Sequence, residues 1–221
     1  MANTQQLENP AVPELPVAGV VYSGQLVNQT NGSLRLFFTR LMSDLRALFG
    51  VRGGQYLNIP YGAFQDTTDQ TATANTATVM TFNTTDFSNG VTVVTSGGKA
   101  SRLTVSQAGL YNLQFSAQFQ NTDTQLHDVS IWLRKDSSGA GVDIDGSTGL
   151  ISVPNSHGGI DGHTISGWNY FVSLSANDFV EIWWSTPSTN VTIQAYAAGT
   201  SPTRPATASV VATLTFVSNI Y

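Results

Sequence analysis

Cysteine is absent from the 221 residues of this chain, so neither a disulfide framework nor a thiolate metal site can form. Charged side chains are scarce, at 10% of the residues, against about 25% in ordinary soluble domains. No stretch reaches the ~18 to 20 apolar residues of a membrane span, and the N-terminus lacks the order of a signal peptide. We expect a protein that folds by packing and assembly, without membrane insertion or a standard secretion signal.

Basic residues are also too few to make a nucleic-acid surface. Nine Lys and Arg stand against fourteen Asp and Glu, which gives a net charge of -5, whereas phosphate binding needs clustered cations. Thr, Ser, Asn, Gln and Gly are abundant instead. A surface solvated by neutral hydroxyls and amides suits a component crowded against its own copies in a particle.

Residues 1–30 are predicted to be an extended N-terminal arm that anchors the protein to a particle. Pro10, Pro13 and Pro16 lie among small and polar residues, a composition that favours polyproline-like chain with little ability to fold alone. The arm either becomes ordered against a partner or is a disordered tail, and the sequence leaves both readings open.

Residues 31–54 are predicted to hold an amphipathic helix. Asn31, Gly32 and Ser33 supply capping chemistry, and Gly50 provides a left-handed stop. Apolar residues at a 4-3-4-3 spacing are typical of the seam between packed helices. In this segment the seam residues are Leu34, Phe38, Leu41, Leu45 and Leu48. We expect this seam to form a trimer contact, with docking onto the chain's own β-domain as the alternative.

Residues 55–221 show the period of β-structure. In LYNLQFSAQF, residues such as Leu113 and Phe115 share one face while Gln114 and Ser116 take the other. About ten such runs predict an all-β, antiparallel two-sheet jelly roll. The runs FVEIWW, at 179–184, and ASVVATLTFV, at 208–217, are apolar on both faces, so we expect both to be covered on both sides.

Two motifs carry a resemblance to a known family. Gly109-Leu-Tyr111-Asn-Leu-Gln-Phe115 and Asn177-Asp-Phe-Val180, with their order among the strands, resemble the C1q/tumour-necrosis-factor jelly roll over about residues 60–217. This resemblance implies a tight homotrimer formed through aromatic-rich faces. In a trimer of this kind, Trp183 and Trp184 in the doubly apolar run 179–184 are the expected trimer residues of the β-domain.

Longer segments resemble virion structural proteins of tailed phages, particularly those of aquatic bacteria and cyanobacteria. They are SGQLVNQTNGSLRLFFTRL at 23–41, GGQYLNIPYGAFQDTT at 53–68, ISVPNSHGGIDGHTISGWNYFVSL at 151–174 and AYAAGTSPTRPATASVVATLTF at 195–216. This resemblance implies a protein of the virion, assembled in the cytoplasm of an infected bacterium.

The chemistry-bearing residues give no pattern of catalysis, so we expect a non-enzyme with no catalytic residue and no cofactor. His157, Asp161 and His163 have the donor types of a zinc site. Asp143 and Asp145 begin like a calcium loop that lacks its distal glutamate. In both segments an ordinary ordered loop is the favoured interpretation, and we expect no metal.

The leading hypothesis is a trimeric tail or neck fibre whose arm joins other phage structural proteins and whose heads contact the host surface. The stretch from Asp136 to Gly167, long, polar and glycine-rich, would suit a host polysaccharide or a neighbouring subunit equally well. The alternatives are a capsid decoration or cement protein and, in a different class, a protein that binds or cleaves glycans.

Overall fold

The computed structural model of this protein describes residues 13–15, 17, 23–49, 59–136 and 139–219. The chain divides into two compact units, Met1–Asn58 and Ile59–Tyr221, so the β-unit begins four residues after the predicted position 55. Most of the predicted arm, and positions 50–54 of the predicted helical segment, lie outside the described residues. Within the described part of the chain, no helix combines the length and apolar character of a membrane span.

The helix α1 spans Gly24–Leu48 and begins earlier than the sequence predicts. Ser23 is its N-cap, and the Ser23 hydroxyl accepts a hydrogen bond of 3.4 Å from the Leu26 amide. The predicted start at 31–33 is therefore wrong, and residues 24–30 belong to the helix and not to an extended arm. A single interior glycine such as Gly32 costs only about 1 kcal/mol relative to alanine, which is too little to end a helix.

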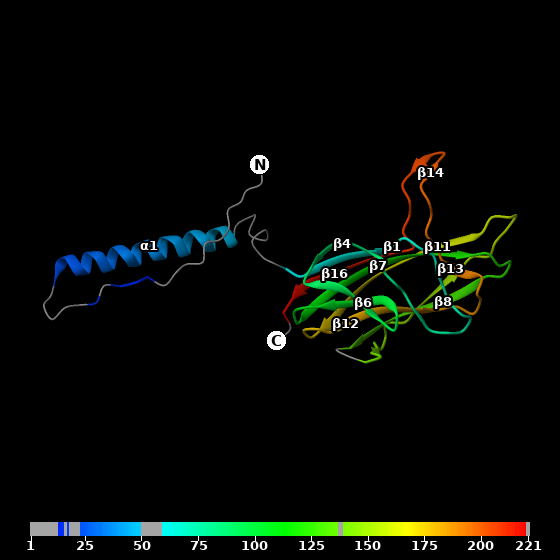
Figure 1. Ribbon diagram of the computed structural model, residues 1–221, viewed down its shortest axis with the longest axis horizontal. Helices are drawn as coiled ribbons and strands as arrows, with labels where there is room; N and C mark the ends of the chain where they lie inside the picture. The colour runs from blue at the N-terminus through cyan, green and yellow to red at the C-terminus, as the bar shows by residue number, and fades with distance from the viewer. Residues whose placement is uncertain (1–12, 16, 18–22, 50–58, 137–138, 220–221) are drawn as a thin grey trace. The chain divides into compact units, whose positions relative to one another are not determined.

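The second unit consists of two antiparallel sheets, shown in Figure 1. Sheet A has the order β2-β13-β7-β16-β1-β4, with β11 also paired to β7. Its strands are β1 (Tyr61–Asp66), β2 (Gln70–Thr71), β4 (Thr84–Asn89), β7 (Gly109–Asn121), β11 (Gly162–Leu174), β13 (Val191–Ile193) and β16 (Val210–Ser218).

Sheet B has the order β10-β8-β12-β6-β5, with β3 paired to β12 and β9 paired to β8. Its strands are β3 (Thr78–Val79), β5 (Val91–Ser96), β6 (Lys99–Val105), β8 (His127–Asp136), β9 (Val142–Asp143), β10 (Gly149–Val153) and β12 (Phe179–Ser185). A separate two-stranded hairpin is made by β14 (Gly199–Thr200) and β15 (Thr203–Arg204).

The strand order is that of a jelly roll. Neighbouring strands follow the order β1-β16-β7-β11 in sheet A and β6-β12-β8-β10 in sheet B. The first long strand, β1, therefore lies beside the last strand, β16, and the chain folds back on itself. The all-β sandwich predicted from alternation is confirmed. The stretch 136–167 is not a continuous loop, because β9, β10 and the beginning of β11 lie within it.

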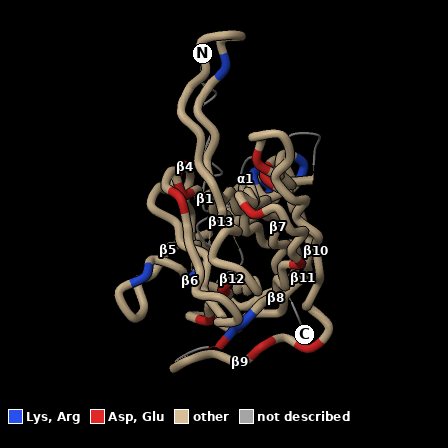
Figure 2. The backbone as a smooth tube through the Cα atoms, turned by 90° about the vertical axis from the view of Figure 1, so that its right-hand side faces the viewer, with Lys and Arg blue, Asp and Glu red and all other residues tan. Residues whose placement is uncertain are grey.

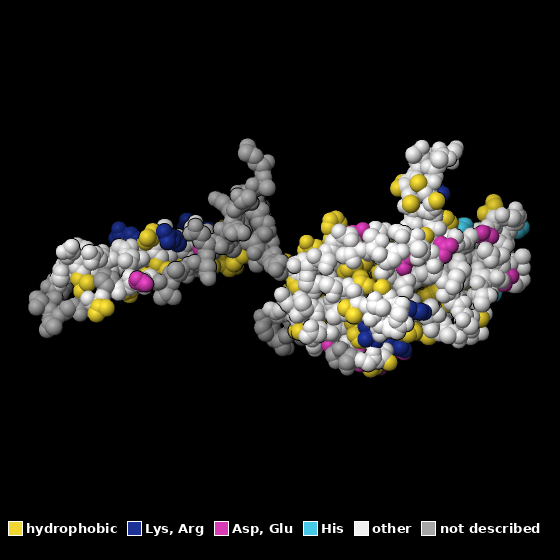
Figure 3. Space-filling model, in the orientation of Figure 1, with side chains coloured by type: hydrophobic (Ala, Val, Ile, Leu, Met, Phe, Trp, Pro, Cys, Tyr) yellow, Lys and Arg dark blue, Asp and Glu magenta, His cyan; other side chains and the backbone are white. Residues whose placement is uncertain are grey.

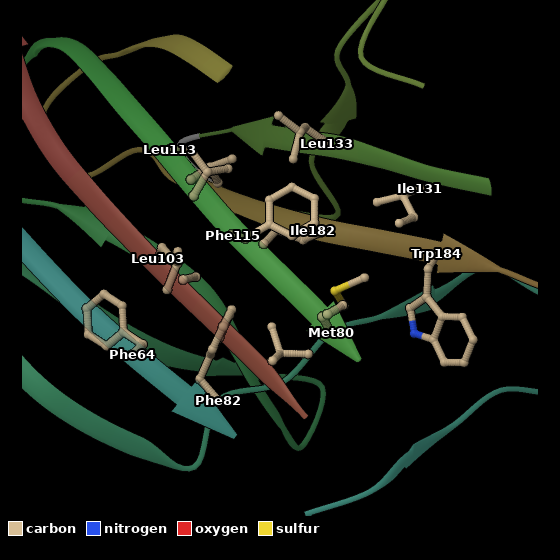
Figure 4. Packing of buried hydrophobic residues seen from close by; sticks show 14 of the residues in the cluster. Phe64, Met80, Phe82, Leu103, Leu113, Phe115, Ile131, Leu133, Ile182 and Trp184 are labelled. Atoms are coloured by element: carbon tan, nitrogen blue, oxygen red, sulfur yellow. The ribbon is translucent and has the colours of Figure 1, made fainter. Parts of the chain in front are cut away.

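The core lies between the two sheets, as Figure 4 shows for residues from both. Strand β7 alternates strictly, with Tyr111, Leu113 and Phe115 buried and the residues between them less so. Larger buried side chains from both sheets and their connections fill the remaining space, among them Phe64, Met80, Leu103, Ile131, Leu133, Ile182 and Trp184. Burial of this kind stabilises a fold by roughly 25 cal/mol per Å² of apolar surface.

Candidate assembly and binding surfaces

The helix α1 leaves apolar side chains on its surface. None of its residues is fully buried. Phe38 of the predicted seam is 55% exposed and Met42 is 49% exposed, while the other four seam residues, Leu34, Leu41, Leu45 and Leu48, are half-buried. Apolar surface of this extent is typical of a helix that packs against a partner.

The two predicted tryptophans point to opposite faces of β12, because side chains alternate along a strand. Trp184 is fully buried, and its ring meets Phe119 edge-on with centroids 5.7 Å apart. Its assignment as a trimer residue is therefore wrong, since it belongs to the core of its own subunit. Trp183 lies on the outer face of sheet B and is only partly buried.

The outer side of β12 is covered by an ionic and aromatic network within the same chain. Glu181, 3% exposed, accepts hydrogen bonds from the Ser101 hydroxyl at 2.9 Å, the Trp183 indole at 3.0 Å and Arg102 Nε at 3.2 Å. The Arg102 guanidinium also lies 3.9 Å from the centre of the Phe179 ring. The expected coverage of this strand on both sides is thus confirmed, without a second subunit.

A second arginine continues the network across β8 and β9. Arg134 Nε donates to Asp143 Oδ1 at 2.8 Å, and its guanidinium lies 4.2 Å from the centre of the Trp183 ring. The Trp132 indole donates to the same carboxylate oxygen at 3.0 Å. Arg134 is the main reason that the pKa of Asp143 lies below its usual value, so this side chain is an ion-pair partner rather than a free calcium ligand.

The three residues of the HGGIDGH segment make separate contacts. His157 lies in a turn closed by backbone bonds with Ile160, Asp161 accepts from the Gln120 amide at 2.5 Å, and His163 Nδ1 lies 3.0 Å from the Tyr196 hydroxyl. Across the residues that the structure describes, no group of three His, Cys, Asp or Glu side chains could hold a metal ion.

The outer face of sheet A carries neutral side chains across three neighbouring strands, and we call this surface the amide face. It contains no Asp, Glu, Lys or Arg. Its members are Leu110, Asn112, Gln114, Ser116, Gln118 and Gln120 of β7, His163, Ile165, Gly167, Asn169, Phe171 and Ser173 of β11, and Val211, Thr213, Thr215 and Val217 of β16. Charged residues are sparse along the whole backbone tube (Figure 2).

The register of the strands places these residues in rows. Gly167, Ser116 and Val211 form one row, and Asn169, Gln114 and Thr213 form the next. A shallow hollow lies over these two rows. The expectation that the run 208–217 is covered on both faces is not met within one chain, because Val211 is 40% exposed and Val217 is 49% exposed.

The β14–β15 hairpin projects from the sandwich on the side of sheet A (Figure 1), and its protruding surface is visible in Figure 3. Its base is closed by two backbone hydrogen bonds between Tyr196 and Thr207, of 2.9 and 2.8 Å. The Tyr196 ring meets the His163 ring edge-on. A pocket of about 430 Å³ lies at this base, lined by Gln118, Phe119, His163, Thr164, Ile165, Tyr196 and Arg204. We call it the hairpin pocket.

The side chains of this pocket could not be grouped from the sequence. Its polar residues come from separate segments of the chain, and only the strand register and the hairpin bring them together. They are Gln118, His163, Tyr196 and Arg204. The polar positions of β7 were recognised as one face, but nothing in the sequence identifies the strand that lies beside them. The proline-containing segment 195–207 predicts a turn, but it does not predict in which direction the hairpin projects.

No protein-family model and no curated protein matches this chain. Among solved structures, it is similar to Eiger TNF from S. frugiperda, with 8% sequence identity and a TM-score of 0.48. The similarity covers 75% of this chain and 96% of that chain. The jelly-roll assignment itself comes from the order of the strands in the two sheets.

Proposed function

We propose that the chain is a non-enzymatic structural protein of a tailed-phage particle, assembled as a homotrimer through the amide face. The particle role is supported by the resemblance of four segments to phage virion proteins. The amide face is the observation that carries the assembly, because it is broad, free of formal charge and partly apolar. The N-terminal segment would join other structural proteins, and the β-heads would project and contact the host.

The chemistry of the amide face favours association with another copy. Burying an unpaired charge costs several kcal/mol, whereas amides and hydroxyls can exchange water for partner groups at little net cost. Exposed apolar side chains would act as anchors within this neutral surround, since a few such residues supply most of the energy of an interface. Phe171, 55% exposed, and Val217, 49% exposed, are two of them.

Gold-labelled antibody against this protein, applied to intact particles, tests the proposed role. Label at the tail or neck is the expected result, and it would support an appendage that takes part in adsorption. Label distributed over the head would contradict the appendage and support a decoration protein that clamps capsid subunits. Particles without label would contradict a virion role altogether.

A further inference from the structure

The hairpin pocket lies at one end of the amide face and is bounded by the hairpin itself. Tyr196 and Arg204 come from the hairpin and its base, while His163 and Ile165 come from β11. Because the hairpin rises from the sandwich near β11 (Figure 1), it borders this end of the face. A neighbouring subunit lying flat on the central rows would therefore not fill the pocket.

The size and lining of the pocket suit a small ring-shaped ligand. Its volume of about 430 Å³ falls within the usual range of roughly 300 to 1,000 Å³ for small-molecule sites. Ile165, 68% exposed, and the ring of Tyr196 give apolar walls. The Gln118 amide, the His163 ring and the Arg204 guanidinium add groups that can form directed hydrogen bonds.

Arg204 can donate hydrogen bonds from its guanidinium group to a ligand in the pocket. Its aliphatic part lies against Gly199, where an added Cβ would fall 2.7 Å from Arg204 Cγ and 2.8 Å from Arg204 Nε. Within the described part of the chain, ion pairs are found for Arg102, Arg134 and His127 and not for Arg204. Its five N–H donors can therefore reach neutral oxygen acceptors on a ligand.

The local electrostatics favour a neutral ligand over an acid. Two carboxylates lie near Tyr196: Asp161 accepts from Gln120, and Asp69 Oδ1 accepts from the Ala195 amide at 2.8 Å. Burial, followed by the charges of Asp161 and Asp69, raises the pKa of the Tyr196 hydroxyl. One arginine near two carboxylates leaves the surroundings slightly negative, which disfavours a uronate or a phosphate.

We propose that the hairpin pocket binds a neutral hexopyranose, one C–H face of which packs on Ile165 and Tyr196 while its hydroxyls bond Gln118 and Arg204. An apolar surface bordered by amide and guanidinium groups matches a sugar, which has both an apolar face and a rim of hydroxyls. This inference rests on the proposed function and gives the host contact a place and a chemical class.

The test is saturation-transfer NMR and calorimetric titration of the full-length protein with the methyl pyranosides of glucose, galactose and mannose, alongside glucuronate. We expect at least one neutral sugar to bind with a Kd of about 1 mM, in keeping with one small ring. Gln118→Ala and Arg204→Ala should each weaken binding by about fivefold or more, through loss of hydrogen bonds. Thr92→Ala, at an exposed position of β5 in the other sheet, is the matched control and should leave binding unchanged.

Three results would overturn this inference: no neutral sugar binding at about 10 mM, tighter binding of glucuronate, or equal effects of the pocket and control variants. A circular-dichroism spectrum identical to that of the unaltered protein excludes unfolding as the cause. A trimer that labels on particles but binds none of the sugars contradicts only this inference. A sugar-binding protein that is absent from particles contradicts only the proposed function.

Discussion

At the scale of single residues, the outer side of β12 depends on one buried carboxylate. Glu181 is the common acceptor for Ser101, Arg102 and Trp183, which approach it from two strands. Removing one partner of such a cluster leaves buried polar groups unpaired, which costs more than the pair itself contributes.

Glu181→Ala should therefore lower the free energy of unfolding by about 3 kcal/mol. Glu181→Gln, which keeps the shape and one carbonyl acceptor, should cost clearly less. Urea unfolding of both variants at one protein concentration measures the difference. Equal stability of the alanine variant and the unaltered protein would show that the network contributes nothing.

Asp123 links the stability of the fold to pH through its contact with His127. His127 Nε2 lies 2.8 Å from Asp123 Oδ2, and this contact, followed by Asn190, holds the pKa of Asp123 below 3.8. Because the pKa is lower when folded, the carboxylate stabilises the fold fully above about pH 3.8 and loses this contribution as the pH falls through the folded pKa.

His127→Ala should therefore raise the pKa of Asp123 toward 3.8. Carbon-13 NMR of the side-chain carboxyl, followed as a function of pH, measures this shift directly. Asn190→Ala should give a smaller rise, because the Asn190 amide lies 3.3 Å from Asp123 Oδ2 and is the weaker of the two contacts. An unchanged titration in the His127 variant would rule out this contact as the cause.

At the scale of elements, β11 contains two glycines with different surroundings. A Cβ at Gly162 would lie 1.8 Å from the Pro154 carbonyl oxygen, whereas one at Gly167 would lie 3.7 Å from the Phe115 carbonyl oxygen. Backbone atoms cannot rotate away as a side chain can, so close approach at Gly162 requires the absence of a side chain.

Gly162→Ala should destabilise the protein by about 1 to 3 kcal/mol, the usual cost of overpacking. Gly167→Ala, in the same strand, should change stability by less than about 0.5 kcal/mol. Thermal unfolding of the two variants side by side gives the comparison. If both lose the same stability, the close approach to Pro154 is not the reason for glycine at 162.

Alternation along the sequence predicted strands such as β7 and β8 well, because one apolar and one polar face is a local property. The helix start was missed because Asn31, Gly32 and Ser33 carry the same capping chemistry as Ser23, and one interior glycine is too weak a break to end the helix. Trp184 was placed outward although period-two alternation sends it and Trp183 to opposite faces. The hairpin pocket depends on register, which the sequence does not encode locally.

At the scale of the whole molecule, charge on the amide face should control assembly. Gln114→Glu combined with Asn169→Asp preserves shape but puts two carboxylates into one row of the face. If this face joins the subunits, like charges facing a desolvated interface will convert the trimer to monomer. Analytical ultracentrifugation measures the change in mass.

The matched control is Thr92→Glu, which adds a carboxylate at an exposed position of β5 in the other sheet. This variant should remain trimeric. A monomeric mass for the unaltered protein, or a trimer that tolerates the paired substitution, would contradict the assembly through sheet A.

The neutral character of the amide face has a consequence for the conditions in which the protein can work. Dissolved ions weaken contacts between charges over a Debye length of about 10 Å at 0.1 M salt, but they have little such effect on contacts between amides and hydroxyls. A surface that lacks Asp, Glu, Lys and Arg over three strands therefore presents nearly the same adhesive properties in fresh water and in brine. Salt concentration, which changes the strength of many protein associations, should therefore have little effect on assembly through the amide face.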